Sequence, residues 1–441
     1  MISPVTASGG GELPTALPAG VLRGPRTVVF GVGQRRVVPE LVRASGGEAL
    51  VITDPRLADS PYLGELVDRL RAAGVATRVF DEAAPELPLE QVPQAVDVAR
   101  RGGAEVIVGF GGGSCVDLAK VVALLLAHGG SAPDYYGENT VPGSTTPVIA
   151  IPTTAGTGSE VTPVAVITDP DRISKVGISS PHLIPTAAVC DPELTVSCPR
   201  SVSAAAGADA LSHGVEAFTA IRRPVTATLA TERVFVGKGV LTDVFALLAV
   251  RQVAAHLRRV CQVADDLEAR SGMMLAALAG GYAFGTAGTA AAHALQYPIG
   301  ALTHTSHGVG VGTLLPYVMA FNAPMRMPEL AELAAALGVG ECGADEVPAG
   351  RQAARARAAV TAVADLLASV GIPADLAALG VPADRLPWAA AEAMTARRLV
   401  DNNPRPLDEA AALTLLRAAH AGDRTAAVAT PETVRTGRTT S

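Results

Sequence analysis

The sequence is poor in aromatic residues and in lysine. Aromatic residues make up 3% of the chain, so its cores must be built from the Ala, Val and Leu that dominate the 49% of hydrophobic residues. Only Lys120, Lys175 and Lys238 occur, and 35 − 3 leaves 32 arginines among the basic residues. A general replacement of Lys by Arg explains this bias. It also favours the hypothesis that the three lysines lie where a compact ammonium fits better than a planar guanidinium.

Several classes of protein are disfavoured by what the chain does not contain. The net charge is −7 and no basic run occurs, which argues against nucleic acid and anionic membrane surfaces as partners. No run of about 20 apolar residues suggests a membrane span, and the Gly/Pro-rich first 26 residues lack the apolar segment of a signal peptide. Five scattered cysteines without a C-x-x-C pair indicate reduced thiols. We therefore expect a soluble cytoplasmic protein.

A length of 441 residues suffices for two domains. We interpret residues 1–26 as a disordered leader, 27–200 as an α/β domain and 201–441 as a helical domain. Short apolar runs in the second range predict strands, with helical patterns between them, at 27–33, 48–54, 76–80, 105–113 and 146–152. This alternation predicts a mostly parallel sheet covered by helices, a fold class typical of dinucleotide binding.

Beyond residue 201 the sequence pattern changes to Ala-rich segments with helical periodicity. Residues 221–240 interrupt that periodicity and are expected to form a loop excursion.

A glycine-rich turn follows the predicted strand 105–113. Gly111, Gly112, Gly113 and Ser114 lie where that strand passes into a helix. Glycines admit a ligand close to the backbone, and the free N–H groups of a helix start suit a phosphate. A plain strand–helix turn is the alternative interpretation.

Two further features suit a nucleotide. Asp54, at the end of the second predicted strand, can bind ribose hydroxyls and repel a 2′-phosphate, although an Asx turn before Pro55 explains it equally well. The segment 151–160 (IPTTAGTGSE) is dense in N–H and hydroxyl donors and can wrap a pyrophosphate or nicotinamide, or serve as a linker.

A carboxylate and several imidazoles indicate a metal site. Asp209 and His213 are four residues apart on a predicted helix and therefore project from the same face. Three of the eight histidines, His293, His304 and His307, cluster later in the chain. Each histidine alone is explained by core or surface packing. Together, on Ala-rich helices, they favour a site for Fe(II) or Zn(II).

These motifs resemble the iron-containing (group III) alcohol dehydrogenases. The resemblance rests on GFGGGSCVDLAK (109–120), IPTTAGTGSEVTP (151–163), GADALSH (207–213), HALQYPIGALTHTSHG (293–308) and DNNPRP (401–406). It runs from about residue 27 to the C-terminus. It implies a two-domain architecture like that of dehydroquinate synthase, with a dinucleotide-binding α/β domain and an all-α domain that binds the metal.

The resemblance also implies roles for individual residues. The metal ligands would be Asp209, His213, His293 and His307, and the spacing 307 − 293 = 14 matches that of the family's last two ligands. The cofactor would be NAD, with NADP disfavoured by Asp54. The pyrophosphate would be held by the 111–114 turn with Thr153, Thr154 and Thr157 nearby, and Asp117, Lys120 and Lys175 match recurrent family positions near the cofactor.

The chain departs from the family pattern at two places. Tyr297 stands where many members carry a histidine proposed to relay protons. A phenol has a pKa of about 10, so Tyr297 or His304 is the candidate for that catalytic role. The 221–240 excursion lengthens the interval between the second and third ligands, as in the hydroxyacid–oxoacid transhydrogenases of the same family. Lys238 within it, together with the nearby arginines, suggests an anionic substrate.

The resemblance implies hydride transfer between a nicotinamide and a small alcohol or aldehyde, with the metal as Lewis acid on the substrate oxygen. Candidate substrates are simple alcohols and aldehydes, succinate semialdehyde and phosphonoacetaldehyde. One alternative is a lyase of the dehydroquinate synthase type, which would retain NAD through turnover. Another is a catalytically silent binding protein. We also expect a homo-oligomer.

Overall fold

A six-stranded parallel sheet forms one half of the protein, in the order β1-β9-β6-β4-β2-β3. The structure is a computed structural model that describes residues 19–172, 175–224, 226–340 and 349–428. The strands are β1 (Thr27–Phe30), β2 (Glu48–Ile52), β3 (Ala76–Phe80), β4 (Val106–Gly111), β6 (Val148–Pro152) and β9 (Ala187–Cys190). β4, β6 and β9 are buried along their whole length, as expected of apolar strands covered on both faces.

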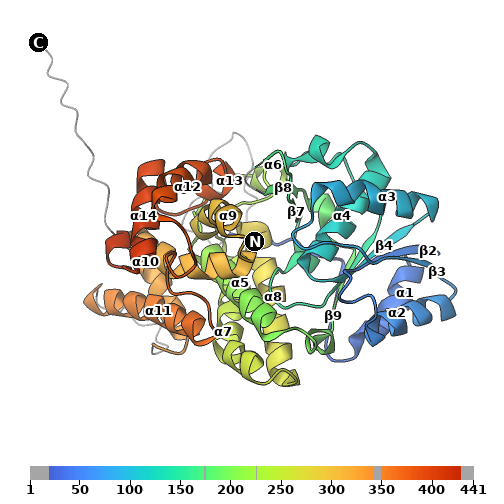
Figure 1. Ribbon diagram of the computed structural model, residues 1–441, viewed down its shortest axis with the longest axis horizontal. Coiled ribbons are helices and arrows are strands. Elements are labelled where there is room, and N and C mark those ends of the chain that lie inside the picture. Colours follow the sequence, from blue (N-terminus) through green and yellow to red (C-terminus); the bar gives the residue numbers. More distant parts are fainter. Residues whose placement is uncertain (1–18, 173–174, 225, 341–348, 429–441) are drawn as a thin grey trace, which may run out of the picture.

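Helices cover both faces of this sheet (Figure 1). α1 (Val38–Arg43) and α2 (Pro61–Ala72) pack on one face, and α3 (Val92–Arg101) and α4 (Gly113–His128) on the other. A three-stranded sheet of β5 (Gly137–Glu138), β8 (Val176–Ser179) and β7 (Val164–Ile167) lies beside α4.

The other half of the protein is helical (Figure 1). Its long helices are α5 (Arg200–Thr219), α7 (Val240–Gln262), α8 (Leu267–Ala287), α9 (Ala291–Thr303), α10 (His307–Ala336) and α11 (Ala349–Ser369). Shorter ones are α6 (Leu229–Glu232), α12 (Leu386–Ala393), α13 (Arg397–Val400) and α14 (Glu409–Ala421). Small residues let these helices approach closely: a Cβ added at Gly207 of α5 would lie 2.3 Å from a methyl carbon of Leu257 in α7.

The predicted fold class is confirmed, with a parallel α/β half followed by a helical half. The last strand ends at Cys190 and α5 begins at Arg200. Within the range expected to be helical, residues 341–348 and 429–441 lie outside the described residues. The described cysteines are Cys115, Cys190, Cys198 and Cys261, and all four are free and buried.

The N-terminal segment differs from the expected leader where it is described. Residues 1–18 lie outside the described part of the chain. Residues 19–26, in contrast, contact the 221–240 excursion: Arg23 donates hydrogen bonds to the carbonyls of Val234 at 2.7 Å and Arg233 at 3.1 Å. These bonds were not predictable from the sequence, because each joins residues more than 200 positions apart.

One helix is long and apolar enough to cross a membrane, judged only by length and composition. This helix is α7, with a mean hydropathy of 1.5 in its most apolar window. It packs along α5 and α8, and a third of that window (33%) is buried. The sequence, which has no run of about 20 apolar residues, did not predict such a helix. The core helix of a soluble protein passes the same test, so this finding is weak support for a membrane span.

Candidate active site

Three helices bring the four expected metal ligands together. Asp209 and His213 lie one turn apart on α5, His293 lies in the first turn of α9, and His307 begins α10. The Oδ1 atom of Asp209 is 3.5 Å from Nε2 of His213, 3.7 Å from that of His293 and 3.6 Å from that of His307. Four side chains that are up to 98 residues apart in sequence (307 − 209) therefore surround one point.

The donor atoms fit a cation. Asp209 Oδ1 and His293 Nε2 are buried and have no hydrogen-bond partner among the described residues. Donor atoms of Asp209, His213 and His293 all lie within 4.8 Å of one another. Buried polar atoms without partners are costly, and a divalent ion bound to these oxygen and nitrogen atoms would satisfy them.

Two further residues orient the imidazoles from behind. Glu216 Oε2 accepts a hydrogen bond from Nδ1 of His293 at 2.5 Å, and Gln296 Oε1 accepts one from Nδ1 of His307 at 2.8 Å. A proton on Nδ1 leaves the lone pair on Nε2 free to bind a metal. Glu216 is itself fixed by the backbone N–H groups of Ala290 and Ala292.

The protonation states of the cluster also suit a metal. Burial lowers the pKa of His213 to about 4 and that of His307 to about 3, so both rings are neutral at pH 7. Burial acts the same way on His293, but the charges of Glu216 and Asp209 and the hydrogen bond to Glu216 raise its pKa to about 9. Burial opposes ionisation of Asp209, yet the neighbouring histidines lower its pKa well below the usual range. A bound cation would displace the proton on Nε2 of His293.

The expected nucleotide site lies at the carboxyl end of β4. Gly112 and Gly113 join β4 to α4, and no side chain caps the first turn of α4. A Cβ added at Gly113 would lie 2.6 Å from Cγ2 of Thr157, so the 151–160 loop approaches the helix start too closely for any side chain there. The site therefore combines free helix N–H groups with a close backbone, as a pyrophosphate requires.

A large cavity of about 570 Å³ connects the two groups. It is lined by Asp209, His213, His293 and His307 at the metal cluster. Of the residues expected near the cofactor, it is lined by Asp54, Gly112, Gly113, Ser114, Asp117, Thr154, Thr157 and Lys175. Gly111 and Thr153 are buried behind this lining, and Lys120 is fully buried, where its ammonium bonds Ser159, Thr162 and Val164.

The two residues expected to relay protons are placed differently. Tyr297 lines the cavity, four residues after His293 on the same helix. His304 is exposed at the end of α9, where its backbone adopts the left-handed conformation (φ 52°), and it does not line the cavity. Only Tyr297 is therefore within the site.

Lys238 is also misplaced for the role that the sequence suggested. Its ammonium lies 2.6 Å from Asp243 and 3.7 Å from the centre of the Phe218 ring, with 1% of the side chain exposed. It does not line the cavity, so the hypothesis that it binds an anionic substrate was wrong. The 221–240 excursion contributes Phe235 to the cavity instead.

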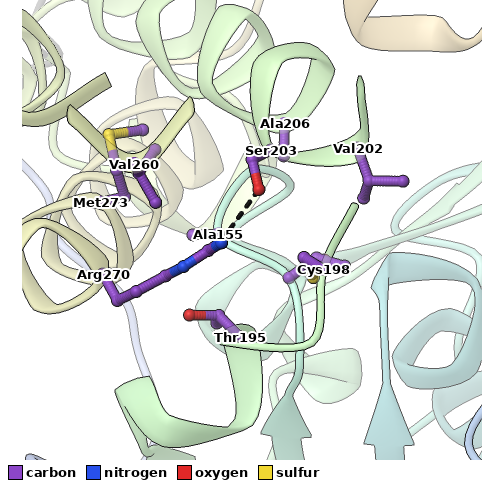
Figure 2. Close-up of a pocket in the computed structure, with 10 residues that line it drawn as sticks. Ala155, Thr195, Cys198, Val202, Ser203, Ala206, Val260, Arg270 and Met273 are labelled. Carbon is purple, nitrogen blue, oxygen red and sulfur yellow. Dashed lines mark hydrogen bonds between the residues drawn. The ribbon is translucent and has the colours of Figure 1, made fainter. Parts of the chain in front are cut away.

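A second, much smaller hollow lies between the 151–160 loop and the starts of α5 and α8 (Figure 2). Arg270 reaches across it and donates a hydrogen bond to Ser203 Oγ at 2.9 Å. The space, about 10 Å³, has room for one water molecule. We interpret it as a structural contact between the two helices.

Sequence reasoning missed four residues that contribute to the site: Glu216, Gln296, Phe235 and Arg398. A signal existed for two of them, since Glu216 and Gln296 each follow a ligand by three residues on a helix and so share its face. Phe235 and Arg398 reach the cavity from a loop and from the four-residue helix α13, which carry no periodic signal.

Comparisons with known proteins agree with this architecture. The iron-containing alcohol dehydrogenase family matches residues 25–192, and its C-terminal family matches residues 203–420. A long-chain-alcohol dehydrogenase of Geobacillus thermodenitrificans is 36% identical over 88% of this chain and 93% of its own. An NAD-dependent methanol dehydrogenase of Bacillus methanolicus is 33% identical over 81% and 88%. The crystal structure of a 1,3-propanediol oxidoreductase superimposes with a TM-score of 0.82 at 30% identity, covering 90% of this chain and 99% of that one.

Fold and site together define a two-domain oxidoreductase in which a glycine-rich turn and an Asp–His cluster line one cavity. The chain belongs to the iron-containing alcohol dehydrogenase family, and its activity is that of an oxidoreductase acting on CH–OH groups. Family membership favours this activity over the dehydroquinate synthase-type lyase.

Proposed function

We propose that this protein is a metal-dependent, NAD(H)-linked alcohol dehydrogenase or aldehyde reductase of small substrates. The observation that supports it most strongly is that the buried Asp–His cluster and the glycine turn before α4 open on the same cavity. A substrate between them would contact both groups at once, and such positioning lowers the barrier to reaction.

Asp209, His213, His293 and His307 would hold the metal, Fe(II) or Zn(II). When bound, the ion supplies Lewis acidity and the nicotinamide exchanges a hydride. The chain itself orients the histidines through Glu216 and Gln296. Burial raises the pKa of Tyr297, so its Oη keeps its proton at neutral pH and is available as a hydrogen-bond donor in the cavity.

Asp54 supports NAD over NADP. It lines the cavity, and its Oδ1 accepts a hydrogen bond from Leu57 N at 3.2 Å, which fixes a negative charge at the end of β2. A 2′-phosphate would meet that charge. We also propose a soluble cytoplasmic enzyme that forms a homo-oligomer, which light scattering of the purified protein would test.

The test is anaerobic NADH oxidation by metal-stripped protein that is re-supplied with Fe(II) or Zn(II), across neutral and anionic aldehydes. We expect turnover that depends on the metal and that falls at least about 10³-fold in His293→Ala, because one ligand and its Glu216 partner are lost. His256→Ala, a histidine of α7 that does not line the cavity, is the matched control. If the metal-bound protein failed to oxidise NADH with every aldehyde of the panel, the proposal would be contradicted.

A further inference from the structure

Arg398 projects into the cavity from α13, next to the helix that carries His293 and Tyr297. Its Cζ atom lies 4.1 Å above the centre of the Phe235 ring, and Phe235 lines the same cavity. Phe235 belongs to the 221–240 excursion, so this segment helps to position the guanidinium.

Among the residues that the structure describes, no carboxylate forms an ion pair with Arg398. Three basic side chains line the cavity, and two of them face acids: Arg56 lies 3.9 Å from Asp54, and Lys175 lies 3.2 Å from Glu86. In the described part of the chain, Arg398 forms neither an ion pair nor a side-chain hydrogen bond, and its Nη1 atom is buried without a partner.

Removing the Arg398 guanidinium from water without an ion-pair partner costs folding free energy. Burial lowers the pKa of Arg398, while Tyr297, Glu138 and Glu216 act in the opposite direction. A guanidinium nevertheless stays charged at all physiological pH values. Arg398 is half-buried, and a charge that is partly removed from water without a carboxylate beside it is stabilised when an anion binds there.

A glycine packs beside the guanidinium. Gly288, with φ +82°, lies between α8 and α9, and a Cβ added there would be 3.4 Å from Arg398 Nη1 and 2.9 Å from Asn402 Nδ2. A side chain at position 288 would collide with the Asn402 amide and would make ordinary contact with Arg398 Nη1, and the positive φ itself favours glycine there.

We propose that Arg398 binds the anionic end of the substrate, which makes the substrate a small aldehyde or alcohol with a carboxylate, sulfonate or phosphonate group. This inference rests on the proposed dehydrogenase function and specifies its substrate class. The planar fork of a guanidinium matches such oxyanions with two parallel hydrogen bonds. The guanidinium lies over the Phe235 ring, and the metal cluster that would receive the aldehyde end lines the same cavity.

The test compares kcat/KM for succinate semialdehyde with that for pentanal, a neutral aldehyde of similar length. We expect Arg398→Met to lower the anionic-to-neutral ratio about 30- to 100-fold, the loss typical of a charge-assisted pair. Arg398→Lys should restore part of the ratio, since it restores charge but not the fork. Arg397→Met is the matched control, because Arg397 is exposed on the same helix and pairs with Asp401 at 3.6 Å. Sulfoacetaldehyde and phosphonoacetaldehyde then distinguish the three oxyanions.

A second readout does not require turnover. Ethanesulfonate, a monoanion that binds metals poorly, should bind metal-free wild-type protein in calorimetry and bind Arg398→Met at least about 30-fold more weakly. Turnover of neutral aldehydes with an unchanged ratio in Arg398→Met would overturn this inference and leave the dehydrogenase proposal intact. Absence of all turnover would instead contradict the proposed function, and ethanesulfonate binding would then decide on Arg398 alone. No binding to the wild type overturns the inference.

Discussion

The imidazole of His293 faces a carboxylate on each ring nitrogen, with Glu216 at Nδ1 and Asp209 at Nε2. The two acids do different work. Asp209 has an oxygen without a partner that is available to a cation, whereas Glu216 uses both oxygens to accept hydrogen bonds from Ala290, Ala292 and His293. Glu216 therefore acts as a positioning residue that fixes the ring and its tautomer.

Glu216→Gln tests this positioning role. The amide keeps the size of the side chain but loses the charge that favours a proton on Nδ1, and partners of this kind are typically worth 10- to 100-fold in metal affinity. We expect the Zn(II) dissociation constant to rise about 10- to 100-fold while the far-UV spectrum stays unchanged, measured by competition with a chromophoric chelator. Glu268→Gln, at an exposed glutamate of α8, is the control. Equal affinities in the two variants would show that Glu216 is only structural.

The proposed preference for NAD over NADP rests on Asp54. Asp54→Asn keeps an oxygen that can accept the Leu57 N–H but removes the negative charge at the end of β2. We expect the ratio of kcat/KM for NADPH to that for NADH to rise at least about tenfold, because repulsion of the 2′-phosphate is lost. Asp59→Asn removes the same charge from an exposed position of the same loop and should leave the ratio unchanged. A ratio that moves equally in both variants contradicts the assignment.

Elements with a strong periodic pattern were predictable from the sequence, and irregular ones were not. The strands expected at 48–54, 76–80 and 146–152 appear as β2, β3 and β6, because buried parallel strands form continuous apolar runs. α13 and α6 have four residues each, too few for a helical period to show. α10 runs to Ala336 and contains three prolines and a kink at Arg326, which obscure its helical pattern in the sequence.

The 151–160 loop is fastened to α4 by a buried charge cluster. Lys120 Nζ hydrogen-bonds Ser159 Oγ at 3.0 Å and the carbonyls of Thr162 and Val164 at 3.0 and 2.8 Å. Burial lowers the pKa of Lys120 to about 8 and raises that of Glu160, in the same loop, to about 7. These bonds explain why an ammonium with several donors occupies position 120.

The raised pKa of Glu160 makes stability depend on pH. The folded state holds this proton up to about pH 7, and the unfolded state only up to its usual value near 4.5. The stability gained by protonation is therefore present below pH 4.5 and lost as the pH rises through 7. We expect the stability of Glu160→Gln relative to wild type to increase by about 1–3 kcal/mol between pH 5 and pH 8, measured by urea unfolding. Glu90→Gln, at an exposed position, should show no such change. A relative stability that is equal at both pH values contradicts this expectation.

For the molecule as a whole, the sequence predicted the metal-binding residues of the cavity better than the other residues that line it. The spacing of Asp209 and His213 on one helix fixed their common face, and the family resemblance supplied His293 and His307. The structure places all four around one point. Two of those other residues were not predictable, because Phe235 and Arg398 meet only when a loop, α9 and α13 pack together. Lys238, the cation that the sequence favoured, instead neutralises Asp243 inside the helical half.

The metal-binding residues all belong to the helical half, and the glycine turn belongs to the sheet half. Zn(II) and NADH should therefore stabilise the protein independently of each other. Zn(II) at 100 times its dissociation constant should stabilise the folded state by about 2.7 kcal/mol, visible as a rise in Tm, and NADH at the same relative concentration by a similar amount. Asp209→Asn should abolish the Zn(II) shift and keep the NADH shift, since Asp209 Oδ1 is the atom that the three histidines surround. Asp97→Asn, away from the cavity on α3, should keep both shifts. If Asp209→Asn lost the NADH shift as well, the cofactor would depend on the metal cluster, and the view of two independent binding sites in one cavity would be wrong.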